Sequence, residues 1–128
     1  MNSTDRFALL CATVTVHSLE VEAAAHPGDR LRERTYLVHR AALADRSVPA
    51  LAELEHPKIS VQDTEDTARR LLEHDRAHAT GRGPVPPTDA RWDTDPRGYT
   101  RQEHAAVVLD DHNQQFAREA TLLATESS

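Results

Sequence analysis

Helix-breaking residues are concentrated in one short run, GRGPVPP at 81–87. This run holds three of the chain's seven prolines and two of its four glycines. Proline removes a backbone donor and glycine loses more conformational freedom than other residues, so a regular helix does not pass through it. The stretch that follows, as far as Gly98, is polar and contains one tryptophan. We therefore expect a Pro/Gly-rich connection over about 81–98 that crosses between helices.

Residues 4–25 contain neither proline nor glycine, and apolar residues recur there at alternating three- and four-residue steps. That spacing places them on one face of a helix, which we expect to point inward. A strand is the alternative over 12–22, because residues 13–16 alternate threonine and valine, which are both β-branched. The length of the segment favours the helix, and Pro27 and Gly28 end it. The expected inward stripe consists of Phe7, Leu10, Val14, His17, Val21 and Ala24.

Three helical segments are predicted in the middle of the chain. Asp29 caps a helix over 30–45, and a short helical turn over 47–55 follows it, with a serine as its cap. A long helix over 61–80 has acidic residues in its first turns, where the helix dipole favours them, and ends before Gly81. The expected inward residues are Leu31, Thr35, Leu37, Val38, Ala41 and Ala42 in the first of these helices, and Val61, Thr64, Ala68, Leu71, Leu72, Asp75 and Ala79 in the long one.

Thr100 and Glu103 stand at the spacing of a capping box, in which each side chain binds a backbone N–H group of the first turn. We therefore expect the last helix to run over about 100–124, with frayed chain ends at 1–4 and 125–128. The segments together predict an all-α fold, a small helical bundle of about four longer helices plus a short helix, in a single domain. The inward face of the last helix is expected to hold Ala105, Val108, Leu109, His112, Phe116, Ala120 and Leu123.

The formal net charge is −6 at pH 7. Neutralisation of phosphates supplies most of the affinity of nucleic-acid-binding proteins, so this charge argues against a nucleic-acid partner. Arg30, Arg32, Arg34 and Arg40 are a local exception. Because acidic residues interrupt them, we interpret them as the solvated face of a helix.

The chain offers little apolar material, since hydrophobic residues make up 38% of it and aromatic residues 4%. A thin core predicts that another chain covers part of the apolar surface, so we expect an accessory protein that acts through protein–protein contacts, with a homodimer favoured. The single cysteine, Cys11, is expected in the core and fits a cytoplasmic protein. No uninterrupted apolar run reaches about 18 residues and no signal-peptide pattern is complete, so we expect no membrane partner.

Eight histidines are many for 128 residues. His74 and His78 are four residues apart on one predicted helix face, a spacing at which two ring nitrogens bind one metal ion. Two further histidines lie in the middle of the expected inward stripes of the first and last helices, and helical bundles build metal sites from such facing side chains. This hypothesis requires the helices to converge, and the zinc-protease motif is absent. The predicted Zn or Fe site consists of His17, His74, His78 and His112, with Glu20 and Asp111 as neighbouring carboxylates.

Two further alternatives rest on weaker patterns. A pocket inside the bundle with a histidine as general acid or base is compatible with the composition, although no glycine-rich phosphate loop and no nucleophile motif are present. Trp92, Arg97 and Tyr99 lie in or next to the connection and form a candidate interaction loop, because binding residues are common in loops. The simpler interpretation is that the two aromatic side chains anchor the connection to the helices.

Overall fold

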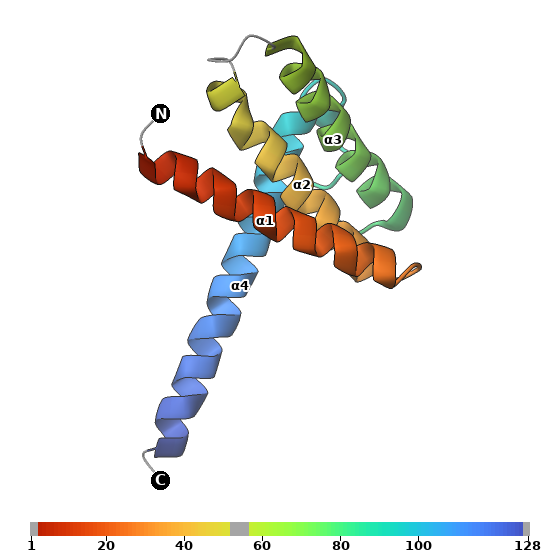
Figure 1. Cartoon of the computed structure of the whole chain (residues 1–128). Helices are drawn as coiled ribbons and strands as arrows, with labels where there is room; N and C mark the ends of the chain where they lie inside the picture. The colour runs from red at the N-terminus through yellow and green to blue at the C-terminus, as the bar shows by residue number, and fades with distance from the viewer. Residues whose placement is uncertain (1–2, 52–56, 127–128) are drawn as a thin grey trace.

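Four α-helices and one short 3₁₀-helix form the part of the chain that the computed structural model describes, residues 3–51 and 57–126. No strand occurs in these two ranges, and the predicted all-α fold is confirmed. In chain order the helices are α1 (Ser3–Ala25), α2 (Arg30–Leu51), α3 (Pro57–His78) and α4 (Pro96–Glu126), with the 3₁₀-helix η1 (Ala90–Asp93) in the connection before α4 (Figure 1).

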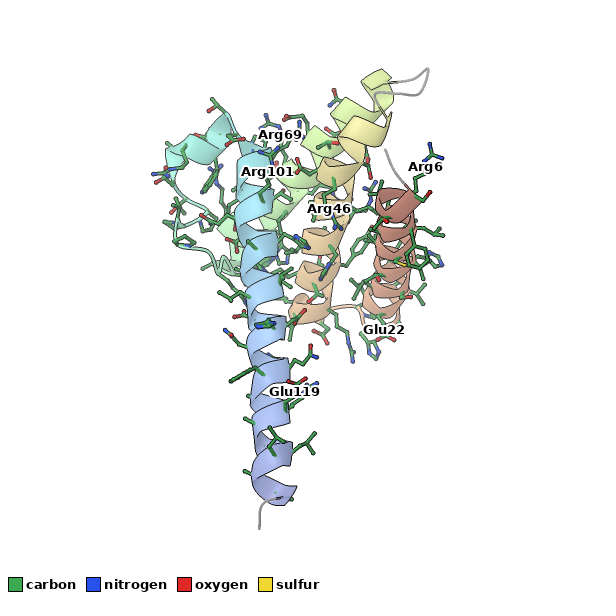
Figure 2. The ribbon with its side chains drawn as sticks, turned by 90° about the vertical axis from the view of Figure 1, so that its left-hand side faces the viewer. Arg6, Glu22, Arg46, Arg69, Arg101 and Glu119 are labelled. Carbon is green, nitrogen blue, oxygen red and sulfur yellow. The ribbon has the colours of Figure 1, made fainter. Side chains whose placement is uncertain are left out.

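Helix α2 is the centre of the arrangement. It lies antiparallel beside α3 (Figure 1), whereas α1 and α4 lie on opposite sides of it (Figure 2). The first part of α4 packs against α2 and α3. The second part extends away from the other helices and ends far from them, as Figure 1 shows. The structure is therefore a small bundle with one projecting helix.

The hydrophobic core lies between α2, α3, η1 and the first turn of α4, and α1 contributes no residue to its central cluster. The predicted inward faces of the two middle helices are largely confirmed, because Val38, Ala42, Ala68 and Leu71 are all buried. Leu31 and Ala79 are exceptions, since Leu31 is 62% exposed at the start of α2 and Ala79 is exposed beyond the end of α3, while the burial of Val61 lies outside the described residues. The core cluster consists of Leu37, Val38, Ala41, Leu71, Leu72, Trp92 and Tyr99.

The prediction for the inward face of α1 is wrong. All of the residues expected there are exposed, and the side that packs against α2 holds Val16, which is buried, and four half-buried residues. The two sets are offset by two residues, which is about 200° around a helix. Helix α1 therefore carries two apolar stripes on opposite sides, and periodicity does not say which one packs. The half-buried residues of the packed stripe are Leu9, Ala12, Leu19 and Ala23.

Three helix boundaries in the middle of the chain differ from the prediction, and one of them is the start of α3, which lies at Pro57 and not at about 61. Asp29 caps α2 as expected, since its Oδ1 accepts the backbone N–H of Arg32 at 3.2 Å. The hydroxyl of Ser47 donates to the carbonyl oxygen of Leu43 at 2.7 Å, so Ser47 lies within α2 and starts no separate short helix. Helix α3 ends before Ala79, which has a φ of 53°, and not at Gly81. Cys11 is exposed, not in the core.

Helix α4 begins at Pro96, four residues before the start that the capping-box pattern predicted. Asp95 is the cap, because its Oδ1 accepts the backbone N–H of Gly98 at 3.0 Å, and Pro96 occupies the first helical position, which tolerates proline. Thr100 and Glu103 are buried inside the helix and cap nothing. The predicted inward face is also wrong, because all of its members are exposed, and those beyond residue 110 have no neighbouring helix in the described chain. They are Ala105, Val108, Leu109, His112, Phe116, Ala120 and Leu123.

Candidate functional site

Charged side chains from three helices meet in the interior. Arg34 of α2 is 5% exposed, and Asp75 of α3 and Glu103 of α4 are 0% exposed. The guanidinium of Arg34 donates from Nε and Nη2 to the two oxygens of Asp75, each over 2.9 Å, and from Nη2 to Glu103 Oε1 over 2.6 Å. A forked pairing of this kind is stronger and more directional than one hydrogen bond. The prediction that Arg34 lies on a solvated helix face is therefore wrong.

Glu103 also holds the Pro/Gly-rich connection against α4. Its Oε1 accepts the backbone N–H of Arg82 at 2.6 Å, and its Oε2 accepts that of Gly83 at 2.8 Å. The neighbouring Gln102 side chain accepts from the Val85 N–H at 3.2 Å and donates to the Val85 carbonyl at 2.8 Å. The connection thus has a fixed path, because two side chains of α4 replace the backbone partners that a helix or strand would supply.

Asp75 has further donors around it. The Tyr99 hydroxyl donates to its Oδ2 and the Thr80 hydroxyl to its Oδ1, the latter at 2.7 Å. Burial opposes ionisation of Asp75, but the hydrogen bonds, first that of Arg34, outweigh it and hold the pKa of Asp75 below its usual value. Burial and the bond to Asp75 raise the pKa of Tyr99 far above its usual value, so Tyr99 stays neutral. The oxygens of the buried carboxylates are engaged by the chain itself, and the cluster is a structural link between three helices.

The aromatic residues of the connection lie inside the protein. Trp92 is 6% exposed, its Nε1–H donates to the carbonyl of Pro86 at 3.0 Å, and its ring centroid lies 5.4 Å from that of Tyr99. Arg97 donates from Nε to Asp45 Oδ1 at 2.7 Å and so pairs with α2. The prediction that Trp92 anchors the connection is confirmed. All three candidate loop residues contact their own chain in this structure.

The His74 and His78 rings lie together on α3, with centroids 4.7 Å apart. His74 is buried, and its Nδ1 lies 3.3 Å from Asp75 Oδ1. Its Nε2 has no hydrogen-bond partner among the described residues and lies 3.9 Å from a carboxylate oxygen of Glu33. His78 is exposed.

The other two histidines of the predicted metal site are not brought to this pair. His17 is exposed on α1, as is its neighbour Glu20, and His112 and Asp111 are exposed at the beginning of the projecting part of α4. Within residues 3–51 and 57–126, no group of three or more His, Cys, Asp or Glu side chains is placed to hold a metal ion.

Large apolar side chains are exposed on two helices. Phe116, in the projecting part of α4, is 68% exposed, and Phe7, near the start of α1, is 67% exposed. Leu109, Phe116 and Leu123 follow one another at intervals of seven residues, which is the repeat of a helix that packs along another helix. The exposed large residues are Phe7, Leu10, Val14 and Val21 on α1, Leu31 on α2, and Val108, Leu109, Phe116, Leu122 and Leu123 on α4.

Helix α1 is also apolar over most of its length. Its residues Arg6–Ala25 are long and apolar enough to cross a membrane by length and composition, with a mean hydropathy of 1.3, and 6% of that window is buried. The sequence prediction required an uninterrupted apolar run, which this segment lacks. Serine, threonine and a few charged residues interrupt the apolar residues, but they are too few to lower the mean hydropathy of the segment.

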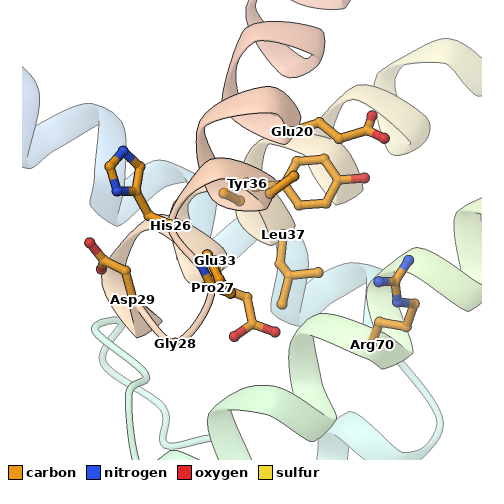
Figure 3. Close-up of a pocket in the computed structure, with 11 residues that line it drawn as sticks. Glu20, His26, Pro27, Gly28, Asp29, Glu33, Tyr36, Leu37 and Arg70 are labelled. Atoms are coloured by element: carbon orange, nitrogen blue, oxygen red, sulfur yellow. The ribbon is translucent and has the colours of Figure 1, made fainter.

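A groove runs between α1 and α3 over the surface of α2. It consists of two hollows of about 510 and 370 Å³ that share Glu20. Figure 3 shows the larger hollow, in which Tyr36 and Leu37 of α2 lie between Glu20 of α1 and Arg70 of α3. The smaller hollow has Leu43 and Ala44 of α2 as apolar lining. The groove thus has an apolar floor and charged walls, and sequence periodicity did not indicate it because it depends on how far apart α1 and α3 lie.

The buried cluster had one signal in the sequence. Asp75 stands within the apolar stripe of its helix, and a buried charge requires a partner. The identity of that partner depends on helix packing, so Arg34 and Glu103 were not predicted.

No known protein family, no curated protein and no solved structure matches this chain.

Proposed function

We propose that this chain is a small cytoplasmic accessory protein that works by binding a helix of a protein through α1 and the projecting part of α4. One observation carries the proposal: of the ten large hydrophobic residues that are exposed in the described chain, four lie on α1 and five on α4, where they repeat at helical spacing. Apolar residues scattered singly on a surface require no explanation, whereas apolar stripes indicate an interaction surface.

The magnitude of the exposed apolar surface supports this proposal. Complete burial of a Val, Leu or Phe side chain stabilises by roughly 1.5–3 kcal/mol, so side chains that are half to two-thirds exposed would gain about 1–2 kcal/mol each on binding. The nine residues together correspond to about 10 kcal/mol or more. Association costs about 4–15 kcal/mol in lost freedom of motion, so both helices are needed for a stable complex.

A protein helix suits these surfaces better than a membrane. Helices that lie on a membrane are rich in Lys and Arg on their polar face, and anionic lipids attract that charge. In the described part of α1, Arg6 is the one Lys or Arg residue and Glu20 and Glu22 are acidic, within a chain of net charge −6. The heptad spacing of the α4 stripe is, by contrast, the pattern that packs against another helix.

A photo-crosslinking residue placed next to the α4 stripe, at Gln115, tests the proposal in living cells. We expect one discrete protein adduct, identified by mass spectrometry, that disappears when Leu109 and Phe116 are both changed to serine. These two side chains are exposed, so the substitutions remove the apolar stripe without opening the core. The matched control changes Gln114 to serine on the opposite side of α4 and keeps the adduct.

Three results would count against the proposal. They are the absence of any adduct from α4 or from a second probe at His17 of α1, an adduct that persists in the serine variant, and a chain that sediments with membranes and labels lipid only.

A further inference from the structure

We propose that the partner is a second copy of this chain, and that the projecting part of α4 of each copy lies in the groove between α1 and α3 of the other. The inference rests on the proposed function of the α4 stripe and names its partner, and on α1 it uses the groove wall, which leaves Phe7, Leu10, Val14 and Val21 outside the contact. A chain of this shape carries both a groove with no helix in it and a helix with no groove around it.

The lengths of the two surfaces agree. The α1 wall of the groove extends from Thr13 to Ala24, which is about 17 Å along a helix. The stripe on α4 extends from Leu109 to Leu123, which is about 21 Å. Leu37, Leu43 and the ring of Tyr36 give the groove an apolar floor onto which the α4 side chains would pack.

One charge on each surface also agrees in position and sign. Glu20 and Arg70 face the groove from its two walls, and neither side chain has an ion pair or hydrogen bond in the described chain. The projecting part of α4 has Glu119 on the flank of the Phe116 stripe, and among the described residues it accepts a hydrogen bond only from Gln115. A docked α4 therefore brings a carboxylate to a groove wall that holds the unpaired guanidinium of Arg70.

The groove cannot be filled by the α4 of its own chain. Helix α4 lies on the other side of α2 from α1, and its projecting part leads away from the bundle, as Figure 2 shows at Glu119. If each copy places its α4 in the groove of the other copy, the groove and the α4 stripe of both copies are covered. This arrangement makes the same contact twice about a two-fold axis, so the assembly closes as a dimer and does not grow into a filament.

Mixing two variants of the purified full-length chain tests this arrangement. The groove variant carries Thr13→Arg and Ala24→Arg, one substitution in each hollow, and the α4 variant carries Phe116→Arg. All three positions are exposed, so both variants should keep the helical circular dichroism of the wild type. Analytical ultracentrifugation then measures the mass of each variant and of their mixture.

We expect the wild type to have twice the 14.2 kDa mass of one chain, each variant alone to be a monomer, and the equimolar mixture to regain a dimer. Rescue follows because the intact α4 of the groove variant enters the intact groove of the α4 variant. The matched controls Ser18→Arg on α1 and Gln114→Arg on α4 lie away from the proposed contact and should stay dimeric.

Other results would overturn the inference in recognisable ways. A groove variant that dimerises alone while the α4 variant does not means that α4 pairs with α4. The reverse result means that α1 pairs with α1. Both of these outcomes leave the proposed function standing. A wild type that is monomeric at every concentration removes the second copy as partner, and the crosslinking experiment then decides whether another protein binds.

Discussion

Replacing Asp75 with asparagine tests whether the buried charge cluster holds the bundle together. The carboxylate of Asp75 is fully buried, receives two hydrogen bonds from Arg34 and accepts from Tyr99 and Thr80. An amide of the same size keeps one acceptor oxygen but turns an NH₂ group toward donors. It also leaves the Arg34 charge with Glu103 as its sole close carboxylate partner among the described residues.

Removing one partner of a buried ion pair costs about 3–5 kcal/mol, a large share of the roughly 5–15 kcal/mol by which a domain of this size is stable. With a urea dependence of about 2 kcal/mol per M, a loss of 4 kcal/mol lowers the unfolding midpoint by about 2 M. The matched control is Asp63→Asn, because Asp63 pairs with Arg40 over 3.0 Å at a surface position where its side chain is 46% exposed. That change should cost less than about 1 kcal/mol.

Urea titrations followed by circular dichroism, at one protein concentration for all variants, measure both changes. Equal concentrations matter because any self-association contributes to the stability. If Asp75→Asn lowers the midpoint no more than Asp63→Asn does, the cluster does not stabilise the fold and the reasoning from burial is refuted.

Three further predictions concern α4. Burial lowers the pKa of both His39 and His104, whose rings are 5.6 Å apart between α2 and α4, below the usual value of 6.5. The folded state therefore binds fewer protons than the unfolded state, so the free energy of unfolding should fall as the pH drops through about 6.5, and the fall should be smaller in a variant with glutamine at both positions. Asp95→Ala should cost about 1 kcal/mol by removing the α4 cap. Gly98→Ala should destabilise the wild type more than it destabilises Asp95→Ala, because its Cβ would lie 2.1 Å from Asp95 Oδ2, and urea titration of the double variant checks this.

The parts of the fold that the sequence predicted are those in which one pattern had one interpretation. Helix α3 has a single apolar stripe, and both the helix and its buried face were predicted, including Asp75. The start of α4 was misplaced because two capping patterns compete within nine residues. Asp95 followed by Pro96 determines the start, since Glu103 is drawn into the core by Arg34 and is not free to cap. A choice between local patterns was thus decided by a contact between distant segments.

The errors on α1 and α4 have a different physical cause. Periodicity reports that one side of a helix is apolar, but it does not report which chain covers that side. Helix α1 has two such sides and α2 covers the one around Val16, while the stripe through Phe116 has no cover within the described chain. The α4 stripe that was predicted to point inward is the one that the proposed contact with a second copy would use. If mixing the groove and α4 variants restores a dimer, the periodicity of α4 identified a buried face correctly, and the error lay in assuming that the chain buries that face alone.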